Sequence, residues 1–104
     1  MCTRPDKEPL PALIIHEKDN VAILTAAAEK GDLVRAQGAG RSVEFRTLDP
    51  IPVYHKAAVV PIPEGAPVVK YGEHIGIADA DIPAGAHVHL HNVRNNREDL
   101  ASQV

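Results

Sequence analysis

Residues 62–68, Ile-Pro-Glu-Gly-Ala-Pro-Val, recur twenty residues later as residues 82–88, Ile-Pro-Ala-Gly-Ala-His-Val, and a fainter copy occupies residues 28–34. In every copy the glycine can adopt the positive φ angle that a tight turn requires. In the two full copies a proline also fixes the backbone two residues before that glycine. Each copy therefore predicts a turn that leads into a strand, and together the copies predict a small, strongly bent β domain.

The rest of the chain agrees with a mainly β fold of short strands. Residues 12–15 and 21–24 are two apolar runs separated by a polar turn, which predicts two strands with a tight connection. Residues 43–48 alternate apolar and polar side chains as a half-buried strand does. In the second half of the chain, prolines interrupt every candidate helix and stand at positions 50, 52, 61, 63, 67 and 83.

One segment favours a helix. Residues 25–30, Thr-Ala-Ala-Ala-Glu-Lys, have good helix propensity, and Gly31 stands where a short helix would end in a left-handed residue. The fold prediction therefore includes one or two helical turns. An alternative is a longer helix that starts at Asp19 and buries Val21, Leu24 and Ala28.

Length and composition restrict the function. A chain of 104 residues predicts one domain, which we place at residues 12–93 between a flexible leader at 1–11 and a tail at 94–104. Three aromatic residues and a net charge of −3 argue against nucleic acid as a partner, because stacking and phosphate binding need rings and cations. The single cysteine and the lack of an apolar signal or membrane segment predict a cytoplasmic protein without a membrane partner.

Three histidines alternate with apolar residues in the segment 87–92, His-Val-His-Leu-His-Asn. In a β-strand alternate side chains share a face, so His87, His89 and His91 are expected on one side while the two apolar residues enter the core. Neighbouring members of such a row lie roughly 6.5 to 7 Å apart at their Cα atoms. Asn92 follows the row and is a candidate either for substrate binding or for capping the next turn.

Two imidazoles at this spacing can bind one metal ion, whereas three on a straight strand do not converge. A metal site would therefore recruit a further group, such as His16, His55 or a carboxylate. The alternative is a polar sheet face whose histidines bind backbone or partner groups without metal.

A second group of candidates lies in residues 70–76, Lys-Tyr-Gly-Glu-His-Ile-Gly. The glycines predict a tight turn between strands, where Lys70 could bind a carboxylate and Glu73 could move a proton. The alternative is a hairpin with solvated charges. Lys56 is a further candidate for neutralising an anionic substrate, although a solvated lysine is the common outcome.

Four segments in their order along the chain resemble the SAF domain of the altronate/galactarate dehydratase family. They are residues 13–21, residues 51–56, residues 69–78 with the pattern KYGExIG, and residues 82–93 with the pattern GxHVHxHN. The resemblance covers about residues 12–93. It implies the β-clip fold of SAF domains and a role as the small subunit or N-terminal domain of a sugar-acid dehydratase.

The chemistry that this resemblance implies is β-elimination of water from a hydroxy acid, in a site shared with a large catalytic subunit. It implies a divalent metal, iron or manganese, with His87, His89, His91 and His16 as candidate ligands. Lys70 and Glu73 become candidate catalytic residues, and Lys56, Tyr71 and Asn92 become candidate substrate-binding residues. The isolated chain is expected to be inactive and is open to self-association through an apolar face left by a missing partner.

Two other classes of function compete with this hypothesis. One is a stand-alone metal-binding or ligand-binding SAF module without a catalytic partner. The other is a structural or carbohydrate-binding module, since one fold serves unrelated functions. The histidine row argues against the second, because an inert surface has no need of it.

Overall fold

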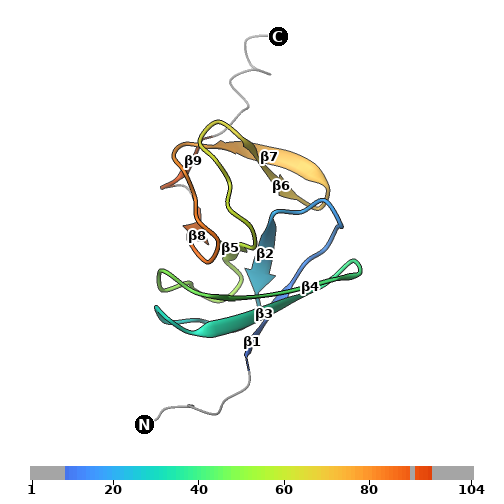
Figure 1. The fold of residues 1–104 in the computed structure, drawn as a ribbon, viewed down its shortest axis with the longest axis vertical. Coiled ribbons are helices and arrows are strands. Elements are labelled where there is room, and N and C mark those ends of the chain that lie inside the picture. The colour runs from blue at the N-terminus through green and yellow to red at the C-terminus, as the bar shows by residue number, and fades with distance from the viewer. Residues whose placement is uncertain (1–8, 90, 95–104) are drawn as a thin grey trace.

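The computed structural model describes residues 9–89 and 91–94, and these form a mainly β domain with curled sheets (Figure 1). The strands of the described part are β1 (Leu10–Leu13), β2 (Val21–Leu24), β3 (Leu33–Gly38), β4 (Arg41–Arg46), β5 (Lys56–Ala58), β6 (Pro67–Lys70), β7 (Glu73–Ala78), β8 (His87–Val88) and β9 (Val93–Arg94). This architecture confirms the small β-clip fold expected of an SAF domain. Residues 1–8 of the leader predicted at 1–11 and residues 95–104 of the tail predicted at 94–104 lie outside the described residues.

The strands form two sheets. The larger has the order β4-β3-β1-β2-β5-β8, and the smaller has the order β6-β7-β9. Strands β1 and β2 pair antiparallel, as the two apolar runs predicted, although β1 starts two residues earlier than expected. Strand β1 also pairs with β3 in parallel. Strand β4 covers most of the predicted strand at 43–48 and buries Phe45.

The predicted helical turn at residues 25–30 is wrong, and so is the longer helix from Asp19. The described residues contain no helix at all, hence none that could cross a membrane. Instead, Ala28 forms a β-bridge with Ile51, with two backbone hydrogen bonds of 2.8 and 2.9 Å. Six residues gain too little from helix propensity to offset the cost of nucleation, so tertiary pairing decides this segment.

The predicted turn-plus-strand repeat is confirmed, and the structure adds a fourth copy at residues 51–57. At the glycine position φ is +91° in Gly31, +87° in Gly65 and +92° in Gly85, and the fourth copy has Tyr54 there with φ +70°. In all four copies the next residue donates its N–H to the carbonyl three residues before it, at 2.9 to 3.1 Å. The strands that follow these turns are β3, β5, β6 and β8.

The four copies also share their core positions. Their first residues, Ala28, Ile51, Ile62 and Ile82, are all buried and form two bridges, 28 with 51 and 62 with 82. Their seventh residues, Val34, Ala57, Val68 and Val88, are fully buried. The repeat therefore fixes both the turns and the apolar side chains on which they rest, and it places the fifth residue of each copy directly before a strand.

Candidate functional site

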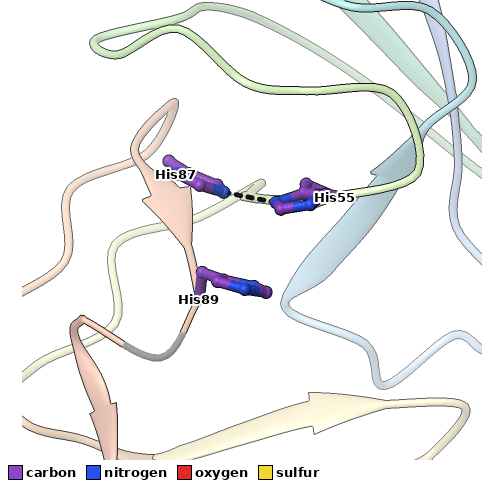
Figure 2. Close-up of side chains that lie close together, drawn as sticks. All are labelled: His55, His87 and His89. Atoms are coloured by element: carbon purple, nitrogen blue, oxygen red, sulfur yellow. Dashed lines mark hydrogen bonds between the residues drawn. The ribbon is translucent and has the colours of Figure 1, made fainter.

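Three histidines from two neighbouring segments come together beside the β5–β8 pair (Figure 2). His55 is the fifth residue of the fourth turn, His87 lies in β8, and His89 follows that strand. One ring nitrogen from each lies within 4.8 Å of one ring nitrogen of the others. Nδ1 of His55 and Nε2 of His87 are hydrogen-bonded at 2.9 Å, so one of these two nitrogens carries the proton and the other accepts it.

The third imidazole stacks on the other two. The ring centroid of His89 lies 4.5 Å from that of His55 and 5.5 Å from that of His87, with interplanar angles of 26° and 9°. All three side chains are partly buried. The arrangement therefore brings three imidazole nitrogens together in a partly exposed group.

Side chains elsewhere in the chain hold the backbone of this cluster. The Asp49 carboxylate accepts a hydrogen bond from the His87 N–H at 3.0 Å. The side chain of Asn92 accepts from the His89 N–H at 3.0 Å and donates to the His87 carbonyl at 2.8 Å. Asn92 therefore positions two of the three histidines through its amide group, and its predicted contact with substrate stays a prediction.

The histidine row departs from the straight strand that the sequence suggested. Strand β8 ends at Val88, which is buried as predicted, and a turn includes His91 and Asn92. The other predicted core residue, Leu90, lies outside the described residues. The exposed His91 has its ring centroid 5.3 Å from that of His87, but it is not in the group of three that can share one ion.

Burial and neighbouring positive charge disfavour protonation of His87 and His89. Burial lowers the pKa of His87 below its ordinary value, and positive charge on His55, His91 and His89 lowers it further, while the Asp49 carboxylate raises it. The pKa of His89 is lowered by loss of solvent and by positive charge on His55, Lys56 and His91. These two rings are therefore more readily neutral, the form that binds metals.

Lys56 lies next to this cluster in a small pocket. The pocket has a volume of about 150 Å³ and is lined by Lys56, Ile75, His89 and Val93. Burial lowers the pKa of Lys56, and the positive charge of Lys70 lowers it further. The two lysines thus sense each other's charge across the two sheets, and neither forms a salt bridge with a described residue.

The predicted turn in residues 70–76 is confirmed as the β6–β7 hairpin. Lys70 and Glu73 pair across its end, and the two residues between them, Tyr71 and Gly72, have φ angles of +58° and +76°. Positive φ at both central residues is typical of a tight hairpin turn of type I′. The Lys70 Nζ atom lies 4.7 Å from the centroid of the Tyr71 ring, and Tyr71 and Glu73 are exposed.

His16 lies at this hairpin and not with the three histidines. A Cβ atom built on Gly72 would come within 2.9 Å of three atoms of the His16 ring. The buried carboxylate of Asp19 accepts hydrogen bonds from the N–H groups of His16, at 3.1 Å, and Gly72, at 2.7 Å. The structure therefore brings His16 close to the hairpin of Lys70 and Glu73, and its role as a metal ligand stays a prediction.

Sequence reasoning missed the residues that fix the hairpin against the larger sheet. Besides Asp19, Asn20 bonds β6 with its side chain, accepting from the Val69 N–H at 2.8 Å and donating to the Pro67 carbonyl at 3.0 Å. The sequence placed these two residues in a polar turn and in the family-like segment 13–21, but it gave their side chains no role. It also named His55 merely as one of several further ligands, since the turn that presents His55 has a tyrosine where the other copies have glycine.

Comparison with known proteins identifies the fold family. Residues 10–96 match the family model described as the altronate/galactarate dehydratase SAF domain. The chain belongs to this family. This SAF domain is 46% identical over 89 residues to altronate dehydratase of Escherichia coli K12, a match that covers 83% of the chain and 17% of that relative.

Two further relatives place the SAF domain in different architectures. Altronate dehydratase of Bacillus subtilis is 40% identical over 86 residues, 83% of the chain and 16% of that relative. The alpha subunit of (2R)-sulfolactate sulfo-lyase from Chromohalobacter salexigens is 31% identical over 88 residues, 81% of the chain and 94% of that relative. The chain thus spans about a sixth of the dehydratases and nearly all of a sulfo-lyase subunit.

Proposed function

We propose that this SAF domain forms one wall of a composite active site in a cytoplasmic hydro-lyase that removes water from a sugar acid of the altronate or galactarate type. The observation that carries the proposal is the group of three imidazoles with Lys56 beside it. The relatives support a lyase context, since they are named dehydratases and a sulfo-lyase subunit.

The pocket argues that another polypeptide segment completes the site. Ligand sites usually enclose about 300 to 1,000 Å³, whereas the pocket at Lys56 and His89 holds about 150 Å³. A six-carbon acid bound there would keep most of its surface in water. We therefore propose a large catalytic subunit, or a catalytic remainder of a longer chain, that closes the site and excludes water.

In β-elimination the proton beside the carboxylate leaves, the neighbouring C–O bond breaks, and the hydroxyl departs as water after it gains a proton. Negative charge builds on the carboxylate, so cations that contact this group stabilise the transition state. Lys56 is suited to this contact because its partial burial reduces screening of its charge. A divalent iron or manganese ion, when bound, would supply further electrostatic stabilisation.

The hairpin residues take the proton-transfer and orienting roles in this proposal. Glu73 moves a proton and Lys70 contacts a carboxylate, with Tyr71 beside it as a binding surface. Lys70 is close enough to Lys56 for its charge to lower the pKa of that lysine, so both cations can act on one small anion. The fixed attachment of the hairpin through Asp19 and Asn20 supports this arrangement.

The test is to purify the chain from its native host and to assay the preparation for dehydration of altronate and galactarate, with iron or manganese added. We expect a larger polypeptide with dehydratase activity, and a loss of that activity in Lys56→Ala and in the double variant His87→Ala/His89→Ala. His74→Ala is the matched control, because His74 is an exposed histidine of β7 outside the cluster.

A second candidate function is a stand-alone metal-binding module. It is favoured by the three imidazoles, since all of them come from this chain. A chain that is recovered alone, inactive and loaded with metal would support this function and contradict the composite site.

A further inference from the structure

We infer that the chain itself binds one divalent transition-metal ion through His55, His87 and His89, without a ligand from the rest of the enzyme. The inference assigns to His55 the further ligand position that the sequence had left open between His16, His55 and a carboxylate. A role of this ion in catalysis rests on the proposed function, whereas metal binding by the chain is measured without any partner.

The distances fit a small movement of side chains. A tetrahedral ion with metal–nitrogen bonds of about 2.0 to 2.1 Å holds its ligand nitrogens about 3.4 Å apart. The hydrogen-bonded nitrogens of His55 and His87 are at 2.9 Å, and all three ligand atoms lie within 4.8 Å of one another. Metal would replace the proton between His55 and His87, and rotation of the side chains would supply the rest.

The ligand chemistry selects the class of ion. Three neutral imidazoles without a carboxylate suit Zn²⁺, Co²⁺, Ni²⁺ or Fe²⁺, whereas Mg²⁺ and Ca²⁺ prefer oxygen ligands. The group is partly exposed, so one or more coordination positions stay open toward solvent. Three protein ligands with an open position are typical of catalytic metal sites, in contrast to closed structural ones. A hydroxy acid can occupy the open position with its carboxylate.

The backbone of each ligand is held in place independently. The turn at 51–57 presents His55, and the N–H of Tyr54 in this turn donates to the Leu24 carbonyl at 2.7 Å. Asp49 holds the N–H of His87, and Asn92 holds that of His89. A site whose supporting contacts are fixed before binding loses less entropy when the ion arrives.

The experiment titrates the metal-free full chain with Zn²⁺ by calorimetry and with Co²⁺ by its visible absorption, which reports nitrogen ligands and coordination number. We expect one ion per chain. Each of the variants His55→Gln, His87→Gln and His89→Gln should weaken binding at least about tenfold, the range seen when support of a metal site is lost. The controls His16→Gln and His74→Gln should stay within about twofold. Far-UV circular dichroism checks that every variant is folded.

Three results would overturn the inference: no binding at one ion per chain, an affinity of His55→Gln equal to that of His74→Gln, or a loss in His16→Gln as large as in His55→Gln. Should any variant fail to fold, cobalt spectra of the folded wild type still decide, since a spectrum without imidazole coordination contradicts the site. Metal binding by the chain, together with a preparation from the native host that holds no dehydratase activity, would leave this inference standing and contradict the proposed function. Activity without metal binding by the chain would do the reverse.

Discussion

Replacement of Gly85 by alanine should cost much more stability than the same replacement at Gly65, although both residues occupy the same position of the repeat. Their φ angles are nearly equal, +92° and +87°. Both substitutions therefore meet the same left-handed strain, about 1 to 2 kcal/mol. Both also regain about 0.4 to 1 kcal/mol because alanine restricts the unfolded chain. The net cost at Gly65 is then about 1 kcal/mol.

The surroundings differ. A Cβ atom at Gly65 would meet nothing within 4 Å, whereas at Gly85 it would lie 2.2 Å from the carbonyl oxygen of Arg46. That contact is far inside the van der Waals distance, and the obstacle is backbone, so the turn or strand β4 must shift. Overpacking of this kind costs about 1 to 3 kcal/mol more. We expect Gly85→Ala to lose about 2 kcal/mol beyond Gly65→Ala.

The measurement is urea unfolding followed by far-UV circular dichroism. With a slope of about 1 to 2 kcal/mol per M urea for a chain of this size, the midpoint of Gly85→Ala should lie about 1 to 2 M below that of Gly65→Ala. The carbonyl of Gly85 also accepts a hydrogen bond from the Leu48 N–H, and its own N–H donates to the Ala58 carbonyl. A shift of this turn would disturb the backbone just before His87, so metal binding should weaken together with stability. Equal midpoints for the two variants would refute the steric argument and leave only the shared φ strain.

Further predictions concern the groups that position the site. The free energy of unfolding should fall as pH drops below about 6.5, the ordinary pKa of histidine. The cause is that the pKa values of His87 and His89 are lowered in the folded chain, so the unfolded chain takes up protons first. The loss should level off below the folded pKa values, and the free energy of unfolding of His87→Gln should depend less on pH than that of the wild type. Asp19→Ala should lower the free energy of unfolding by about 3 kcal/mol, because it leaves the N–H groups of His16 and Gly72 without an acceptor. Urea unfolding measures this loss, and a loss as small as that of an exposed change such as Glu64→Ala would contradict the prediction. Asn92→Ala should cost about 2 kcal/mol through two lost hydrogen bonds, and it should also weaken Zn²⁺ binding in calorimetry, whereas unchanged affinity would show that Asn92 does not position the histidines.

The β fold could be predicted from the sequence because glycine marks the turns of the repeat. The copies at 62–68 and 82–88 keep proline and glycine at fixed positions, and the structure has the same turn in both. The copy at 51–57 escaped notice since Tyr54 stands at the glycine position, even though Ile51 and Pro52 match the other copies. The helix expected at 25–30 was wrong because propensity is local, while the bridge from Ala28 to Ile51 is not.

The candidate site was accessible only in part for a related reason. Alternation in residues 87–92 correctly indicated that His87 and His89 come together. It did not show where the strand stops, since the Asn92 side chain competes for backbone groups that a longer strand would use. The contacts of Asp19 and Asn20 with the hairpin join residues about fifty positions apart, and local patterns contain no information about them.

The attachment of the hairpin by Asp19 and Asn20 has a consequence for how this domain could evolve or be redesigned. The imidazole cluster belongs to the larger sheet, and Lys70 belongs to the smaller one. Two adjacent side chains in the connection before β2 hold the hairpin in register with that sheet. Changes at these two positions would alter the spacing between Lys70 and the imidazole cluster while keeping the side chains of both. In the composite site proposed above, they therefore offer a way to change the size of the acid that fits.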